Sequence, residues 1–204
     1  MRNGLSRLAF VLYCGVNYPP SRFVHIKRHS THRNPHRLMS TKTDAPTAWH
    51  RALNDPQLRA LPYKIETNTH DQIILSPHTP AHSLLQSRIM RLIDRHITQG
   101  GETTVEFPVE TPQGVKVPDV VWLSAEQMSR LSNDVSASPI MPELVVEVLA
   151  AANTEAEMAE KRALYLDEDA QEVWLCAPDG TLTFYDASGR LDASALMPSF
   201  PAKV

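Results

Sequence analysis

Three side chains break the pattern of the segments that carry them. Asp119 follows Pro118 in a β-rich segment, and Glu147 interrupts the apolar run 144–149. A carboxylate inside an apolar strand is costly to bury unless it is paired, hydrogen-bonded or bound to a cation. Lys161 lies further along the chain, at a position that would face the sheet if its segment is a helix. An inward lysine beside two inward carboxylates indicates a functional site.

Two carboxylates and a lysine are the groups that metal-assisted hydrolysis of a phosphodiester needs. Carboxylate oxygens hold Mg²⁺, the metal activates water and shields charge, and an ammonium stabilises the charge that develops on the phosphate. Each residue also has a simpler interpretation. Asp119 alone is typical of a turn residue at a strand end, and Glu147 with Lys161 is consistent with a buried structural ion pair. The three together favour a catalytic site.

A hairpin and a buried strand are predicted to carry the two carboxylates. Strand patterns over 103–109 and 115–123 flank a turn with a proline and a glycine, which predicts a hairpin whose second strand holds Asp119. The near-continuous Val/Leu run 144–149 is typical of a strand buried on both faces, and it holds Glu147. We expect this strand at the centre of the sheet.

A helix after the central strand is predicted to carry Lys161. Thr154 and Glu157 match the Thr-x-x-Glu capping box, so we expect the helix to begin at residue 155 and end near residue 167. The other expected elements are a short helix and loop at 46–61, strands at 63–67 and 72–76, an amphipathic helix at 80–98, a short helix at 125–131 and a hairpin of 172–177 with 181–185. This order predicts a mixed α+β fold in the α/β class, with a mixed β-sheet flanked by helices.

Charge divides the 204-residue chain in two. Residues 1–43 contain eight Lys or Arg and no acidic residue, whereas residues 44–204 carry a net charge of −11. Such a break predicts a basic, disordered N-terminal extension at 1–43 and one folded domain at 44–204. The extension has three interpretations: a targeting peptide, a basic arm that touches nucleic acid, and an upstream extension with Met39 as the working start. We favour the last.

Composition also excludes some classes of protein. No apolar run approaches the roughly 20 residues of a membrane-spanning helix, so the sequence does not indicate an integral membrane protein. Cys14 and Cys176 are far apart and indicate neither a disulfide framework nor a zinc site, which makes a reducing cytoplasm the expected location. Trp122 and Trp174 are expected to pack in the core, and His82 is expected to be a surface or capping residue.

Three segments also resemble the motifs of a known family. They are 117–124 (VPDVVWLS), 142–149 (PELVVEVL) and 160–165 (EKRALY). These look like the motifs of the Uma-two endonuclease family, whose fold is the PD-(D/E)XK restriction-endonuclease-like fold, and the likeness covers roughly 63–201. The resemblance implies a Mg²⁺-dependent endonuclease, with Mn²⁺ as a substitute metal. It also implies nucleic acid as the substrate, with DNA expected, and a homodimer.

The resemblance assigns roles to individual residues. Asp119 and Glu147 would be the metal ligands and acidic catalytic residues, and Lys161 would be the signature lysine, supplied from the following helix. Glu66 and Gln86 are accessory candidates. Glu66 would add a metal ligand from the first strand, and Gln86 would orient water or phosphate from the long helix.

The sequence departs from the family pattern near the expected site. The signature places a lysine two residues after Glu147, where this chain has Leu149. The following turn, usually Ser-Pro-Ser-like, is Ala-Ala-Ala at 150–152, and Ala177 replaces a common Asp. If those polar groups support the site, this copy is weakened.

Two further hypotheses therefore stand beside an active endonuclease. One is a catalytically inactive nuclease-like module that binds nucleic acid or a protein, and the other is a structural domain whose charged trio is a buried network. The charge of −11 on residues 44–204 opposes binding to a polyanion, because phosphate binding depends on Lys and Arg. Arg88, Arg91 and Arg95 have helical spacing and would form either a local basic patch or an ordinary solvated face.

Overall fold

A mixed six-stranded sheet forms the centre of the protein. The computed structural model describes residues 10–12, 47–132 and 134–204. The strand order is β11-β10-β9-β8-β7-β4; β8 and β9 are parallel and the other neighbours are antiparallel. The strands are β4 (Glu102–Val105), β7 (Val120–Leu123), β8 (Leu144–Val148), β9 (Glu172–Cys176), β10 (Leu182–Asp186) and β11 (Gly189–Leu191). All five residues of β8 are buried, as the apolar run predicted.

Two smaller sheets lie beside the central one. The first has the order β1-β3-β2, and the second is the β5-β6 ribbon. Their strands are β1 (Phe10–Leu12), β2 (Tyr63–Thr67), β3 (Ile73–Pro77), β5 (Val109–Thr111) and β6 (Gly114–Lys116). Strand β1 belongs to the predicted basic extension and pairs in parallel with β3. The rest of that extension, with Met39 and Cys14, lies outside the described residues.

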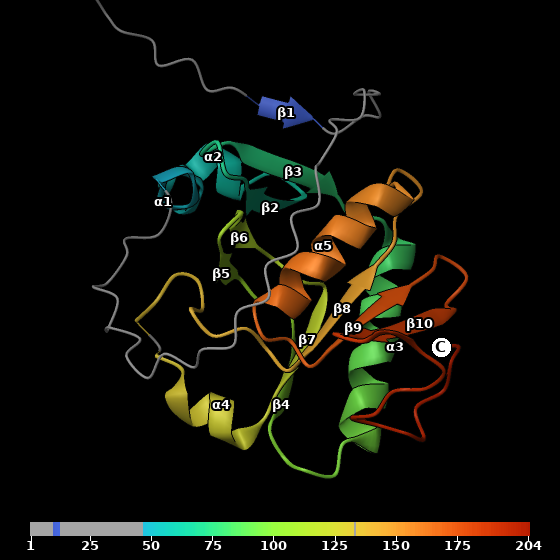
Figure 1. Cartoon of the computed structure of the whole chain (residues 1–204). Coiled ribbons are helices and arrows are strands. Elements are labelled where there is room, and N and C mark those ends of the chain that lie inside the picture. The colour runs from blue at the N-terminus through green and yellow to red at the C-terminus, as the bar shows by residue number, and fades with distance from the viewer. Residues whose placement is uncertain (1–9, 13–46, 133) are drawn as a thin grey trace, which may run out of the picture.

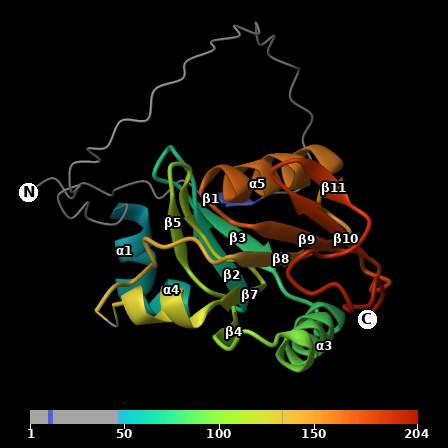
Figure 2. The same cartoon turned by 60° about the horizontal axis from the view of Figure 1, so that its bottom comes forward.

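Two helices cover opposite faces of the central sheet. In Figures 1 and 2, α5 (Glu155–Asp167) lies over one face and α3 (Pro80–His96) over the other. Ile89 and Ile93 of α3 pack in the same core cluster as Trp174, whereas Tyr165 of α5 packs with Val145. The shorter helices are α1 (Thr47–Asn54), α2 (Pro56–Arg59) and α4 (Ala125–Arg130). The predicted fold class, a mixed sheet flanked by helices, is confirmed.

The predicted hairpin around Asp119 is divided into two ribbons. Strand β4 pairs with β7, and β5 pairs with β6 at the tip. The two ribbons separate where Glu106 has a left-handed backbone, with φ of 50°. Pro108 and Pro118 lack the N–H donors that would continue the ladder. This break leaves Asp119 immediately before β7, outside the regular pairing.

No helix in the described part of the chain is long and apolar enough to cross a membrane.

Candidate active site

Glu147 lies in the central strand β8 and has charged or hydrogen-bonding partners on both carboxylate oxygens. Its Oε1 accepts a hydrogen bond from the Tyr165 hydroxyl at 2.7 Å and lies 2.8 Å from Lys161 Nζ. Its Oε2 lies 3.5 Å from Lys64 Nζ. Only 3% of Glu147 is exposed, so these groups replace the water that the carboxylate loses on burial. Residues of α5 and β2 thus supply the charged and hydrogen-bonding partners that offset the cost of burying the Glu147 carboxylate.

Asp119 is fully buried, and four groups surround its carboxylate. Its Oδ2 accepts the Val148 N–H at 2.7 Å, which ties Asp119 to the end of β8. Its Oδ1 accepts from Lys64 Nζ at 2.7 Å and from Gln86 Nε2 at 3.2 Å, and His82 Nε2 also lies 3.2 Å from it. Burial alone would raise the pKa of the Asp119 carboxyl, but the Lys64 ammonium and His82 hold it well below its ordinary value.

Lys64 joins the two carboxylates, and sequence analysis did not identify it. It lies on β2, is 9% exposed, and places Nζ between Asp119 Oδ1 and Glu147 Oε2. Burial alone would lower the pKa of Lys64, but the carboxylates of Glu147, Asp119 and Glu66 raise it well above its ordinary value. Lys64 is therefore a charged ammonium throughout the physiological pH range.

Lys161 reaches the site from α5 as predicted. Its Nζ lies 2.8 Å from Glu147 Oε1 and 2.9 Å from Glu66 Oε1. Glu66, on β2, also accepts the Val117 N–H at 2.9 Å. Burial alone would raise the pKa of the Glu66 carboxyl, but the ammoniums of Lys161 and Lys64 lower it to about 2. The accessory candidate Glu66 is thus an ionised member of the cluster.

Two residues of α3 complete the surroundings of Asp119. The accessory candidate Gln86 is buried and donates to Asp119. The prediction that His82 is a surface or capping residue is wrong, because its side chain is only 13% exposed and faces Asp119. Thr79, not His82, caps α3 by accepting the His82 N–H. The ring of His78 lies edge-on to the His82 ring, with centroids 5.8 Å apart.

The cluster opens into one cavity between β2, β3 and α5. The cavity has a volume of about 320 Å³. Its charged walls are formed by Lys64, Glu66, Lys116, Glu147, Glu157, Glu160 and Lys161. Asp119 does not line the cavity, but Lys64 and His82, which both contact Asp119 Oδ1, do. The predicted trio is therefore in one place, but only Glu147 and Lys161 reach the cavity wall.

Comparisons with known proteins identify the family and support the fold. Residues 55–188 match the family model of Uma2, described as a putative restriction endonuclease. The chain belongs to the Uma2 family. This is the family that the motifs around Asp119, Glu147 and Lys161 resembled. No curated protein matches the chain.

A solved structure supports the fold of this Uma2 protein. The crystal structure of a putative nuclease belonging to DUF820 from Anabaena variabilis ATCC 29413 superposes with a TM-score of 0.52 and 20% sequence identity. The match covers 60% of this chain and 71% of that one. At this identity the match supports the nuclease-like fold alone.

Two of the departures from the Uma2 motifs, Ala150 and Ala152, lie at the same cavity. Ala150 and Ala152 form part of its wall, together with Asn153, whose Oδ1 accepts the Ala150 N–H. The turn after β8 therefore presents methyl groups where the family usually has hydroxyl-bearing side chains. Leu149, which replaces the signature lysine, uses its N–H to bond the Cys176 carbonyl. The ammonium groups at the cavity come instead from β2, β6 and α5.

The burial of β2 shows why sequence analysis missed Lys64. The alternation of a strand places Lys64 and Glu66 on one face, and both are buried while Ile65 between them is partly exposed. A Lys-x-Glu pair in a short strand is usually interpreted as the solvated face. Only the opposed carboxylates of Asp119 and Glu147, distant in sequence, make that face an interior one.

Proposed function

We propose that this protein hydrolyses phosphodiester bonds of nucleic acid, with DNA as the substrate, and acts as an endonuclease. The observation that carries the proposal is the convergence of Asp119, Glu147 and Lys161 beside one cavity, although they come from separate elements of the chain. A Uma2 family member with a nuclease-like fold and this cluster is best explained by nuclease chemistry.

Lys161 is the group that would stabilise charge on the scissile phosphate. Its ammonium reaches the cavity wall and is held by the carboxylates of Glu147 and Glu66, which keep it charged and fixed in position. A preorganised cation stabilises a transition state without reorganisation at the moment of reaction. Lys64 and Lys116 add further ammonium groups to the same wall.

The donor chemistry of the site fits Mg²⁺. Asp119 and Glu147 would hold the ion, because Mg²⁺ is commonly bound by one or two carboxylates together with water and substrate phosphates. No group of three or more His, Cys, Asp or Glu side chains suited to a metal occurs among the described residues, so these two carboxylates would not form a closed cage. A bound Mg²⁺ would supply charge neutralisation and activation of water. Mn²⁺ would substitute for it.

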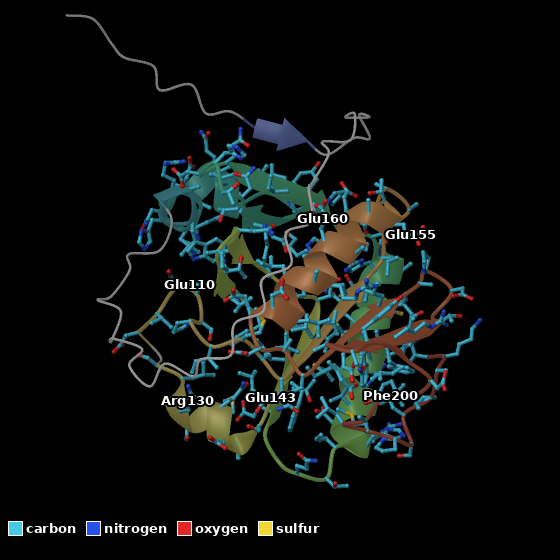
Figure 3. The ribbon with its side chains drawn as sticks, viewed as in Figure 1. Glu110, Arg130, Glu143, Glu155, Glu160 and Phe200 are labelled. Atoms are coloured by element: carbon cyan, nitrogen blue, oxygen red, sulfur yellow. The ribbon has the colours of Figure 1, made fainter. Side chains whose placement is uncertain are left out.

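The test is cleavage of supercoiled plasmid by the full chain with Mg²⁺ or Mn²⁺. We expect nicking and linearisation by the parent protein, and at least about a hundredfold loss of rate in Glu147→Gln and Lys161→Met, as for loss of one charge-stabilising group. Glu155→Gln is the matched control, because Glu155 lies on the same helix as Lys161 but does not line the cavity (Figure 3). Equal rates in all four proteins would overturn the proposal.

An inactive module that binds nucleic acid is the second candidate. It is favoured by the alanines at 150 and 152 in the cavity wall, where polar groups would support catalysis. This candidate predicts that labelled DNA binds without cleavage in the presence of either metal.

Homodimer formation and a cytoplasmic location stay predictions.

A further inference from the structure

One oxygen of each carboxylate in the Asp119–Glu147 pair faces the same cation. Asp119 Oδ2 accepts the Val148 N–H, and Glu147 Oε1 is occupied by Tyr165 and Lys161. The other oxygens, Asp119 Oδ1 and Glu147 Oε2, lie 2.7 Å and 3.5 Å from Lys64 Nζ. Lys64 thus stands where the pair of carboxylates would hold a metal ion.

Every carboxylate of the cluster has an ammonium partner. The carboxylates of Asp119, Glu147 and Glu66 are all within ion-pair distance of Lys64 or Lys161. A divalent ion added to this arrangement would meet an ammonium at close range, and like charges repel strongly where water is excluded. The metal and the Lys64 ammonium therefore cannot hold the same two oxygens together.

Access leads to the same conclusion. Asp119 is fully buried and does not form part of the cavity wall, whereas Lys64 does. Of the side chains that contact Asp119 Oδ1, Lys64 and His82 line the cavity, and Lys64 also contacts Glu147. Metal binding therefore requires that the Lys64 side chain moves.

Lys64 also lines a second cavity of about 220 Å³, which is shared with Glu106 and Tyr63. The four-carbon stem of lysine is flexible and its ammonium is a point charge without a fixed bonding geometry. The carboxylate of Glu106, 45% exposed, would offer the displaced ammonium a counter-charge.

We propose that Lys64 is a built-in competitor of the metal, so that its ammonium and a divalent cation occupy the Asp119–Glu147 pair in turn. This inference rests on the proposed function, because it concerns the same carboxylates. It assigns Lys64 a positioning role: the lysine holds the two carboxylates together before metal binds and sets how strongly the metal binds.

The test measures Mn²⁺ and Mg²⁺ binding to the full chain by titration calorimetry. We expect weak binding by the parent and at least about tenfold tighter binding by Lys64→Met, because the competing charge has been removed. Lys64→Arg keeps the charge and should bind as weakly as the parent. Lys116→Met is the matched control. It removes an ammonium from the same cavity wall that bonds the Thr67 carbonyl instead of a carboxylate of the pair.

The outcomes separate the competition from general electrostatics and from the nuclease proposal. Three outcomes would each overturn the competition. The parent and Lys64→Met could bind the metal with equal affinity, Lys64→Met and Lys116→Met could gain affinity equally, or neither Lys64→Met nor Lys64→Arg could bind the metal at all. If Lys64→Met is too unstable to titrate, Lys64→Gln gives the same comparison, since its amide is an uncharged donor. Tighter metal binding by Lys64→Met without plasmid cleavage in any protein would support the competition and overturn the nuclease.

Discussion

At the residue scale, the site is a set of buried charges whose partners come from distant parts of the chain. Glu147, Asp119 and Lys161 could be predicted, because each places a charge where its own element demands an apolar group. Lys64 could not, because its partners are 55 residues or more away along the chain and its own strand gives no hint of them. His82 was misplaced for the same reason. A histidine in the first turn of a helix resembles a surface residue until Asp119 is placed beside it.

The hydrogen bond from the Tyr165 hydroxyl to Glu147 is expected to stabilise the folded protein. It is fully buried and donates to Glu147 Oε1 at 2.7 Å, and burial together with the Glu147 charge raises its pKa well above the ordinary value. Tyr165→Phe removes this donor from a buried carboxylate. We expect the free energy of unfolding to fall by about 1–3 kcal/mol in urea titrations. Tyr185→Phe, at a half-buried tyrosine of β10, should change it by less than about 0.5 kcal/mol. Equal effects of the two variants would contradict the role given to this hydrogen bond.

Acid should unfold the protein through the carboxylates of the cluster. The pKa of Glu66 is about 2 in the folded protein, and that of Asp119 is also lowered, whereas unfolded carboxyl groups titrate near pH 4. The stability they contribute is therefore fully present above about pH 5 and is lost as pH falls from about 4 towards 2. Lys64 acts in the opposite direction. Its pKa is raised, so its contribution is present below about pH 10 and is lost only in stronger alkali.

Thermal melts of the parent and Glu66→Gln between pH 2.5 and 8 test this dependence. We expect the variant to melt lower at pH 7, since Lys161 loses one of its two carboxylate partners. We also expect a shallower fall below pH 5, because one of the titrating groups is gone. Glu155→Gln, an exposed change on α5, should follow the parent at every pH. An acid limb of the same slope in Glu66→Gln would show that this carboxylate does not carry the pH dependence.

At the element scale, local signals predicted most elements and missed the interruptions. The capping box of Thr154 and Glu157 is present, and α5 has the predicted bounds, 155–167. The strand β11, three residues long, was missed because it is too short to show an alternating pattern. The break in the hairpin before Asp119 depends on the left-handed backbone of Glu106, a conformation that is uncommon for a glutamate and has no signal in the sequence. At this break, the Asp119 side chain contacts Lys64 of β2 and Gln86 of α3.

Three arginines of helix α3 form a row that would bind the phosphates of a nucleic acid. Arg88, Arg91 and Arg95 are all exposed, and Gln86, one half-turn before Arg88, touches Asp119. The row extends about 10 Å along the helix, at 1.5 Å per residue, on the exposed face opposite Gln86. We expect Arg88→Ala with Arg91→Ala to weaken DNA binding. The slope of log affinity against log salt should become shallower by about 0.9 for each phosphate that the variant no longer neutralises.

Fluorescence anisotropy with labelled duplex DNA at several salt concentrations measures this slope. Arg130→Ala is the control, because Arg130 is an exposed arginine of α4, which lies apart from α3 (Figure 3). It should leave the slope unchanged. An unchanged slope in the double variant would mean that α3 presents an ordinary solvated face, the alternative that the sequence left open.

At the scale of the whole molecule, the site depends on how the small sheets dock against the central one. Strand β2 supplies Lys64 and Glu66, the central sheet supplies Glu147, and neither part holds a complete cluster. Local hairpin pairings such as that of β9 with β10 could be predicted from hydrophobic patterns and turn residues, whereas the parallel pairings of β8 with β9 and of β1 with β3 could not. The docking could not be predicted either, because it is specified by single contacts. The bonds from Val115 N–H to the Thr67 hydroxyl and from Val117 N–H to Glu66 join the two small sheets, and the ion pairs of Lys64 join β2 to the central sheet.

A substitution at Gly114, which is outside the charged cluster, tests how the site depends on this docking. It lies at the β5-β6 turn with φ of 92°, and a Cβ built on it would meet the Thr67 backbone at 2.8 Å. Gly114→Ala should therefore combine backbone strain of about 1–2 kcal/mol with a collision that pushes β2 away from β6. Gly100→Ala is the matched control, since Gly100 has φ of 74° and open space around its Cβ position.

We expect both glycine variants to lose stability in urea titrations, but only Gly114→Ala to lose the site as well. A shift of β2 moves Lys64 and Glu66 together, and positioning errors of about 1 Å can cost a hundredfold in rate. Plasmid cleavage and Mn²⁺ titration should therefore both change in Gly114→Ala and stay at parent values in Gly100→Ala. Parent-like metal binding and cleavage in a folded Gly114→Ala would show that the cluster tolerates movement of β2, and that the central sheet with α5 is sufficient to hold it.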